Sequence, residues 1–292
     1  MKRVFLPVGL GLLLCAVQVN LRAGPFPHPG APYTTADLVT AKTRALSGQE
    51  PWAGAWRELF KEADEGLKRP VTPGPKVLEI PQRYVDPAGH LKAREKIDGD
   101  AWAAYVLALA AWLDDDHQRA AAYATKASAI LDSWTATDDI GTYDPAHQSP
   151  HRESALTACT AGNGLIAAAE LLYNNPNWPA DKRRMFIAWT KRVYVPATDI
   201  RTITYDNNWD CWGIYAHLLA CHLTDVRVGF EASEALLKKA IAEQIEDDGS
   251  MPKELARGAG KDWYTYYALT PLTLGACVLV SAARDPVLDP GS

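Results

Sequence analysis

The chain has 292 residues, of which 48% are hydrophobic and 22% are charged, and its formal net charge is -5. This composition predicts a soluble globular protein with a core large enough for one big domain or two tightly packed halves. The absence of a basic excess argues against nucleic acid as a partner, because too few cations are available to neutralise phosphates.

The N-terminus predicts export from the cytoplasm. Two basic residues precede an apolar run, and Ala23 ends a plausible cleavage site, which is the pattern of a secretory signal peptide. We therefore expect residues 1–23 to be removed and residues 24–292 to form a single domain, periplasmic or secreted. Cys15 lacks the small preceding residue of a lipoprotein signal, so a lipid anchor there is the less favoured alternative. No other apolar run is expected to span a bilayer, and no stable membrane insertion should follow cleavage.

An extended leader, residues 24–34, is followed by segments whose apolar residues recur at spacings of three and four, the pattern of amphipathic helices. Links rich in Pro, Gly and Asn separate these segments, and no hairpin dipeptide lies between alternating runs. The predicted helices are 35–48, 51–69, 99–115, 117–135, 153–174, 179–194, 208–224, 229–246 and 262–284.

Consecutive antiparallel helix pairs predict an all-α fold, either a solenoid of repeats or an α/α toroid. One stretch, residues 101–134, superficially resembles a tetratricopeptide unit, but no second clear copy follows. The sequence therefore favours the toroid, here an incomplete barrel of antiparallel helix pairs.

The cysteines provide no sign of a disulfide framework or a metal site. Cys211 and Cys221 fall on one predicted helix, about 15 Å apart along its axis, so they cannot bridge each other. No CxxC or HxxxH pair suggests a metal, so we expect no metal and no other cofactor.

The stretch "YDNNWDCW", residues 205–212, places two asparagines at a predicted helix start. Asparagine is a good N-cap, so a capped helix with aromatic anchors is one interpretation. The alternative is a set of amide donors that grips an anionic substrate. Upstream, His151 precedes another predicted helix, and its pKa range near neutrality makes it a candidate acid or base.

A third polar and aromatic stretch, residues 244–269, becomes specific when it is combined with "NNW". The order of residues, "NNW" and then "Q-x4-GS-x-P-x-EL-x-R-x6-Y", resembles the alginate-lyase type of polysaccharide lyase. The resemblance covers about residues 100–280. It implies a secreted or periplasmic α/α toroid that binds an anionic polysaccharide and cleaves a uronic acid polymer, such as alginate, polymannuronate or a glucuronan, by β-elimination.

The resemblance also implies roles for individual residues. Tyr264, seven residues after Arg257, corresponds to the base that removes the C5 proton and then protonates the leaving oxygen. Asn208 and Arg257 correspond to the groups that neutralise the substrate carboxylate. The remaining candidates for substrate contact or support of the site are Asn207, Trp209, Gln244, Glu254 and Tyr267.

The sequence departs from the family pattern at Trp209, where relatives carry a histidine. Three explanations remain open. Tyr264 acts alone, which suits mannuronate or glucuronate because the C5 proton and the leaving group lie on the same face. Alternatively, His151 supplies the imidazole from another helix, or the protein has lost activity and binds polysaccharide with Trp209 as a stacking platform.

Two function classes outside the lyases are also compatible with the sequence. A glycoside hydrolase on a similar toroid would use two carboxylates, such as Asp139 and Asp144. A non-catalytic helical protein would bind carbohydrate on its aromatic rings.

Overall fold

The computed structural model describes residues 25–141, 143–144, 149–150, 152–198 and 206–283, and most of them are helical. All nine predicted helical segments contain a helix. The helices are α1 (Thr35–Leu46), α2 (Trp52–Lys68), α3 (Pro87–Leu113), α4 (His117–Trp134), α5 (Arg152–Leu172), α6 (Ala180–Trp189), α7 (Val195–Ala197), α8 (Asn208–Leu223), α9 (Arg227–Gln244), α10 (Pro252–Leu255) and α11 (Lys261–Ala283). A π-helical turn, Thr190–Tyr194, joins α6 to α7, and a 3₁₀ turn, Gly258–Gly260, precedes α11.

The strands of the described residues are only two residues long. β1 (Val77–Leu78) pairs in parallel with β2 (Asp139–Ile140), and β3 (Tyr143–Asp144) pairs antiparallel with β4 (Ser149–Pro150). These two pairs join loop segments beside α4 and α5. They are too short to form a separate layer of β-sheet.

Side-chain caps explain where several helices begin. Thr34 and Asp37 form a reciprocal capping box at α1, and the Asp116 carboxylate accepts two backbone N–H bonds at α4. The Asn207 side chain caps α8 by accepting from the Trp209 N–H. This contact confirms the N-cap interpretation of the first asparagine of "NNW".

The beginning of α3 was predicted wrongly. We placed it at residue 99, whereas the helix begins at Pro87, with Asp86 as its N-cap. Proline at the first helical position is a start signal, because its missing N–H has no partner there in any case. The residues between Pro87 and residue 99 include many charged ones and show no clear apolar stripe, so the sequence pattern did not indicate a helix there.

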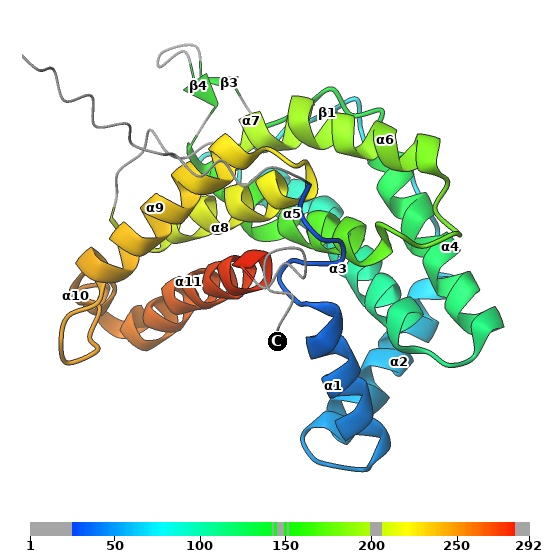
Figure 1. The fold of residues 1–292 in the computed structure, drawn as a ribbon. Helices are drawn as coiled ribbons and strands as arrows, with labels where there is room; N and C mark the ends of the chain where they lie inside the picture. Colours follow the sequence, from blue (N-terminus) through cyan, green and yellow to red (C-terminus); the bar gives the residue numbers. More distant parts are fainter. Residues whose placement is uncertain (1–24, 142, 145–148, 151, 199–205, 284–292) are drawn as a thin grey trace, which may run out of the picture.

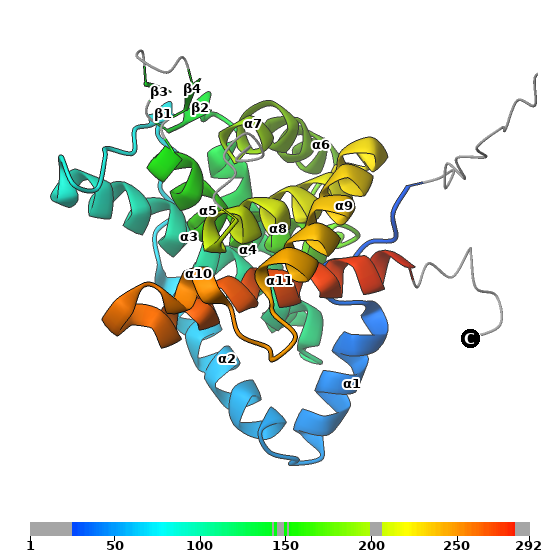
Figure 2. The same ribbon diagram turned by 90° about the vertical axis from the view of Figure 1, so that its left-hand side faces the viewer.

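The helices form two curved layers, and Figure 1 shows them as an open arc with α11 at its inner side. In the inner layer α3 packs against α5, α5 against α8, and α8 against α11, while α2, α4, α6 and α9 lie outside. Viewed at right angles, α1 and α2 form a V-shaped hairpin below the other helices (Figure 2). This arrangement confirms the predicted α/α toroid.

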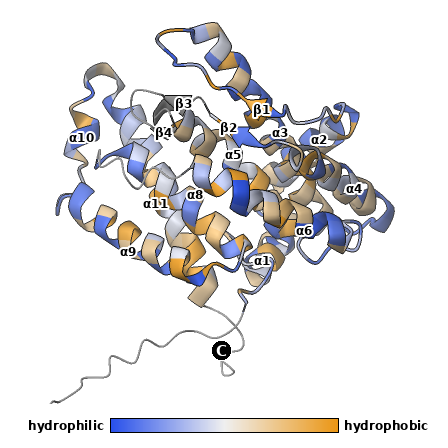
Figure 3. Ribbon diagram, turned by 90° about the horizontal axis from the view of Figure 1, so that it is seen from above, coloured by the Kyte–Doolittle hydropathy of each residue, from blue (hydrophilic) through white to orange (hydrophobic). Residues whose placement is uncertain are grey.

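The core lies between the two layers and contains large aromatic residues. Trp134, Trp178 and Trp189 are all fully buried there. Figure 3 shows hydrophobic residues concentrated where the helices meet, with hydrophilic residues on outer faces and loops. The four described cysteines are free thiols, and three of them are buried.

Two described segments are long and apolar enough, by length and composition, to cross a membrane, contrary to our expectation. They are Ser154–Leu172, of which 78% is buried inside the protein, and Gly258–Ala283, of which 39% is buried. Both belong to helices of the inner layer. Packing within the protein therefore accounts for the apolar character of the first segment.

Candidate active site

The two halves of the sequence motif meet where α8 begins. Asn208 is the first residue of α8, Glu254 lies in α10, and Tyr264 lies in the first turn of α11. Because α8 and α11 pack against each other, residues 46 or more positions apart in sequence become neighbours. The fold thus brings together the segments from which the resemblance was drawn.

Asn208 and Glu254 form a buried pair in the wall of this site. The Asn208 backbone N–H donates to Glu254 Oε1 at 2.7 Å, and its side-chain amide lies 2.9 and 3.0 Å from the two carboxylate oxygens. Both residues are 1% exposed. A buried carboxylate needs such donors, because desolvation of its charge is otherwise costly. Glu254 therefore fixes the orientation of Asn208.

Arg257 and Tyr264 lie together on the open side of the site. The Arg257 guanidinium carbon is 4.1 Å from the centroid of the Tyr264 ring, which is a cation–π contact, and Arg257 is exposed whereas Tyr264 is half-buried. The indole of Trp263 meets the same ring edge-on at 5.1 Å. A cation and a phenol are therefore held side by side, within reach of solvent.

The glycines between Arg257 and Tyr264 are explained by this packing. Gly258 has a φ of +68°, which favours glycine. A β-carbon at Gly260 would lie only 3.1–3.2 Å from carbons of the Tyr264 ring. The backbone therefore approaches the Tyr264 ring closely at a position where glycine leaves room for it.

A substitution at Gly260 can therefore test how strongly kcat depends on the position of the Tyr264 ring. We expect Gly260→Ala to displace the Tyr264 ring by a few tenths of an ångström and to lower kcat roughly tenfold, because a 1 Å misplacement can cost about 100-fold. The melting temperature should change little. Ala259→Ser, at an exposed neighbour, is the matched control, and unchanged kcat in Gly260→Ala would show that the ring position tolerates movement.

Tyr267 lies one helical turn beyond Tyr264 and is held more firmly. Its ring stacks on Trp263 at 4.6 Å and meets Trp212 of α8 at 5.2 Å. Burial raises the pKa of Tyr267, against the opposing effects of Arg94 and of a hydrogen bond with Thr160. Tyr267 therefore stays protonated near neutral pH and is suited to donate a hydrogen bond rather than to remove a proton.

The other residues predicted for the site lie close to it. Trp209 is half-buried in the first turn of α8, beside the Asn207 cap. The amide oxygen of buried Gln244 is 3.2 Å from the Cys211 sulfur, so Gln244 supports the helix start from the end of α9. Burial raises the pKa of the Cys211 thiol to about 12, which leaves it unreactive.

A hollow of about 230 Å³ lies behind the Asn208–Glu254 pair. Its charged lining residues are four carboxylates and one lysine, namely Asp206, Glu243, Glu246, Glu254 and Lys253. The lysine is already paired with Asp206 at 3.0 Å. No aromatic ring among the described residues lines this hollow, so it offers no flat surface on which a sugar ring could stack.

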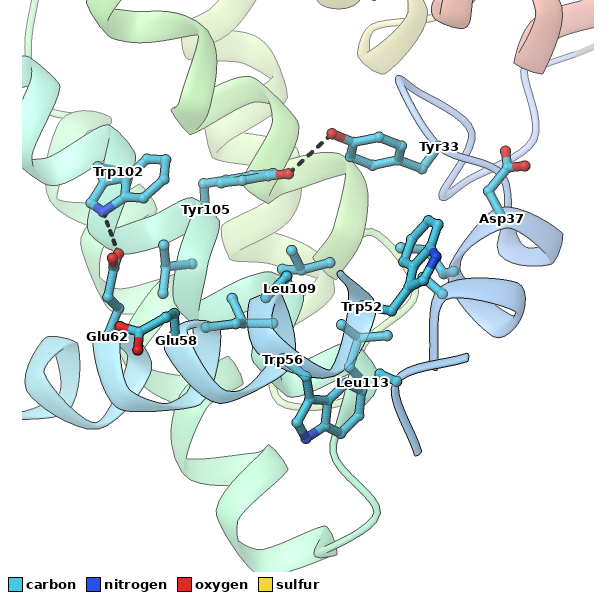
Figure 4. A pocket seen from close by; sticks show the side chains of 16 residues that line it. Tyr33, Asp37, Trp52, Trp56, Glu58, Glu62, Trp102, Tyr105, Leu109 and Leu113 are labelled. Carbon is cyan, nitrogen blue, oxygen red and sulfur yellow. Dashed lines mark hydrogen bonds between the residues drawn. The ribbon is translucent and has the colours of Figure 1, made fainter. Parts of the chain in front are cut away.

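Two aromatic hollows run from the neighbourhood of Tyr267 along α3. The first, of about 270 Å³, includes Thr160, the hydrogen-bond partner of Tyr267, and the second, of about 480 Å³, lies between α1, α2 and α3. They share Tyr33, Trp102 and Tyr105. Figure 4 shows the second hollow, where Trp102 donates to Glu62 and Tyr105 to Tyr33.

Some residues that line these hollows were not identified as binding candidates from the sequence. Trp102 and Tyr105 fall within the predicted helix 99–115, where the sequence gave them no binding role, yet Trp102 is 58% exposed. The pairing of Asn208 with Glu254 was also missed, because no local spacing relates residues so far apart. The motif placed both residues at the site without indicating that they touch.

Some candidates cannot be placed at the site. His151 lies outside the described residues, as does the predicted signal peptide. Of the two carboxylates considered for a hydrolase, Asp139 is exposed in β2, and the side chain of Asp144 lies outside the described part of the chain.

Comparison with known proteins agrees with the fold. The model of the alginate lyase family matches residues 53–285. Among curated proteins, no match to this sequence was found.

Solved structures share the architecture at low sequence identity. A tyrosine-to-phenylalanine variant of alginate lyase A1-III, complexed with a tetrasaccharide, is 20% identical with a TM-score of 0.68, and the match covers 89% of this chain and 72% of that one. An alginate lyase from Bacteroides ovatus is 18% identical, with a TM-score of 0.69 and coverage of 87% and 77%. Alginate lyase A1-III from Sphingomonas species A1 is 18% identical, with a TM-score of 0.67 and coverage of 90% and 73%.

Proposed function

Because the chain belongs to the alginate lyase family of polysaccharide lyases, we propose that it cleaves a uronic acid polymer by β-elimination at Tyr264. The observation that supports this proposal most is the contact between the Arg257 guanidinium and the Tyr264 ring, seven residues apart, beside the Asn208 helix start. An export signal at residues 1–23 would deliver the enzyme to the periplasm or the medium, where such polymers are met.

The reaction needs a base and a means to hold negative charge. Removal of the proton at C5, next to an ionised carboxylate, builds an enolate-like transition state, and donors that neutralise the carboxylate lower its energy. In the proposed mechanism the Tyr264 oxygen takes the C5 proton, the C4–oxygen bond breaks, and the same phenol protonates the leaving oxygen. The product carries a 4,5-unsaturated uronate at its new non-reducing end.

Asn208 and Arg257 are the proposed partners of the substrate carboxylate. One N–H of the Asn208 amide, directed between the two Glu254 oxygens, accounts for both short distances. The second N–H is the donor that we assign to the substrate. Arg257 supplies the positive charge from the solvent side, opposite the buried pair.

Trp209 determines which elimination is expected. An indole cannot act as a base, so we propose that Tyr264 works alone and that the enzyme prefers linkages in which the C5 proton and the leaving group share a face. Mannuronate and glucuronate have that geometry. Elimination across opposite faces would require a second base, for which His151 is the candidate in the sequence.

The aromatic hollows are proposed to bind sugars remote from the cleaved bond. Aromatic rings offer flat surfaces to pyranose rings. The charged residues that line the two hollows are the acids Asp37, Glu58, Glu62 and Asp98. We therefore expect uronate carboxylates to point away from this wall, towards solvent.

This arrangement predicts a length-dependent effect of Trp102→Ala. The variant should raise KM about fivefold for long polymer and leave kcat unchanged, because the lost contact serves ground and transition states alike. The KM for short oligomers should not change. Trp56→Ala would extend the test to the outer part of the hollow. An equal effect on short and long substrates would place Trp102 near the reacting sugar or would show that the fold was damaged.

A substrate panel tests the function directly. The purified protein is mixed with polymannuronate, polyguluronate, mixed alginate and glucuronan, and the ultraviolet absorbance of the unsaturated product is followed. We expect absorbance to rise on polymannuronate or glucuronan and to stay low on polyguluronate. A rise on polyguluronate would contradict the same-face mechanism. New reducing ends without the chromophore would indicate a hydrolase, and folded protein inactive on every polymer would overturn the proposal.

A further inference from the structure

A cluster of two histidines and a glutamate lies at the far end of α8 from the candidate active site. The leader contributes His28, α5 contributes Glu170, and α8 contributes His222. The fourteen residue steps of α8 from Asn208 to His222 span about 21 Å of helix. The cluster is thus separate from the groups proposed for catalysis.

The three side chains meet at short distances. His28 Nδ1 is 2.8 Å from one oxygen of Glu170, and His222 Nδ1 is 2.7 Å from the other. One ligand atom from each of the three residues lies within 4.8 Å of the others. A tetrahedral ion with bonds of about 2.0–2.2 Å holds its ligands roughly 3.3 Å apart, so each imidazole nitrogen would move away from its Glu170 oxygen by about half an ångström to admit the ion.

Two carboxylates face the two imidazoles of this cluster. The Glu170 side chain is 0% exposed, and Asp225, two residues after the end of α8, places its Oδ1 3.9 Å from His28 Nε2. The surroundings therefore favour positive charge at this point.

Both imidazole rings also have one unused nitrogen. Nε2 of His28 and Nε2 of His222 are buried, and neither makes a hydrogen bond to any of the described residues. Buried polar atoms without a partner are uncommon and call for a water or an ion. In protein metal sites, a histidine binds the ion through one nitrogen while the other faces a carboxylate or carbonyl, and with Nδ1 on the ion, Nε2 of His28 faces the Asp225 carboxylate at 3.9 Å.

Packing holds the rings in place for such a role. Tyr173 stacks on His28 with centroids 3.7 Å apart, and Phe26 stacks on His222 at 4.5 Å. The Phe26 N–H in turn donates to Asp225 at 2.7 Å. The donor atoms are therefore preorganised by the aromatic rings and by the leader, which runs across them.

We propose that His28, Glu170 and His222, with Asp225 at the edge, form a structural site for a divalent transition metal. Two imidazoles and a carboxylate suit zinc better than calcium or magnesium, which prefer oxygen ligands alone. The ion would hold the leader, residues 24–34, against α5 and α8. The sequence spacing could not reveal the site, because its three ligands are more than 50 residues apart along the chain.

The experiment measures metal content and stability in the exported, full-length product. Protein dialysed against zinc and then against metal-free buffer should retain about one zinc ion per chain by elemental analysis. Removal of zinc by a chelator should lower the melting temperature by at least about 5 °C, and zinc should restore it. Calcium should have no such effect. Lyase turnover at room temperature should persist without the ion.

Matched variants locate the ion. His28→Gln and His222→Gln should each abolish retention of zinc, whereas His117→Gln, at an exposed position on α4, should not. Cobalt(II) added to chelated wild-type protein should give the visible bands of a tetrahedral site, a readout that needs no variant to fold. Folded wild-type protein that retains no zinc and shows no cobalt spectrum would overturn the proposal, and so would retention of zinc by both cluster variants.

Discussion

Tyr264→Phe should lower kcat on polymannuronate or glucuronan by about 10³-fold or more, because general acid–base groups contribute about 10²–10⁴-fold and this phenol serves both proton transfers. The change removes a single oxygen. The phenylalanine ring can keep the contact with Arg257, which lies over the ring face at 4.1 Å, and the edge-on packing of Trp263. Substrate binding should therefore persist, with a dissociation constant within about twofold of the wild type.

Tyr266→Phe is the matched control, because Tyr266 lies on the same helix and is 71% exposed. It should have wild-type kinetics. Binding of the polymer to Tyr264→Phe can be measured by calorimetry, since no turnover will consume it. Wild-type turnover in Tyr264→Phe would show that Tyr264 is not the base, and His151 would then be the next candidate. Loss of both binding and turnover would indicate that the site had collapsed.

The sequence predicted the fold well, because helix periodicity and capping are local properties. Asn207 caps α8 as expected, and most helix ends fall within two or three residues of their predicted positions. The start of α3 was the exception, because Pro87 was not recognised as a first helical residue. Local signals therefore suffice for helices of this kind when both the apolar stripe and the cap are recognised.

The candidate site was predictable in its members but not in its contacts. The motif named Asn208, Glu254, Arg257 and Tyr264, yet it gave Glu254 only as a candidate for substrate contact or support of the site, without a partner. The structure instead pairs Glu254 with Asn208. The hydrogen-bond partner of Glu254 depends on how α10 packs against the start of α8. A single sequence does not reveal that packing.

The same limit applies to the surroundings of the site. Thr160 and Trp102 come from helices α5 and α3, and nothing near them in the sequence links them to α11. Their place in the lining of one hollow follows from the packing of α3 against α5, which depends on contacts between residues far apart in the sequence. Aromatic content suggested sugar-binding surfaces in general, but only the fold shows which rings line a hollow.

Glu254→Ala should reduce both stability and turnover, because it leaves the backbone N–H and the side-chain amide of Asn208 without their acceptor. Each buried group left unpaired costs about 1–3 kcal/mol, so we expect a loss of about 2–4 kcal/mol in the free energy of unfolding. This corresponds to a fall in melting temperature of roughly 5–12 °C for a domain of this size. Without Glu254 the Asn208 amide is no longer held in one orientation. This loss should lower kcat with little change in KM, because the proposed contact between Asn208 and the substrate strengthens in the transition state.

Glu254→Gln separates these two effects. The glutamine oxygen can still accept from Asn208, so most of the stability should return, whereas the lost second acceptor should leave kcat below the wild-type value. Glu246→Ala is the control, because this exposed carboxylate lines the same acidic hollow without touching Asn208. If Glu254→Ala melted like the wild type, the buried pair would contribute nothing to stability. If it turned over like the wild type, Asn208 would need no fixed orientation, and Arg257 alone would have to neutralise the substrate carboxylate.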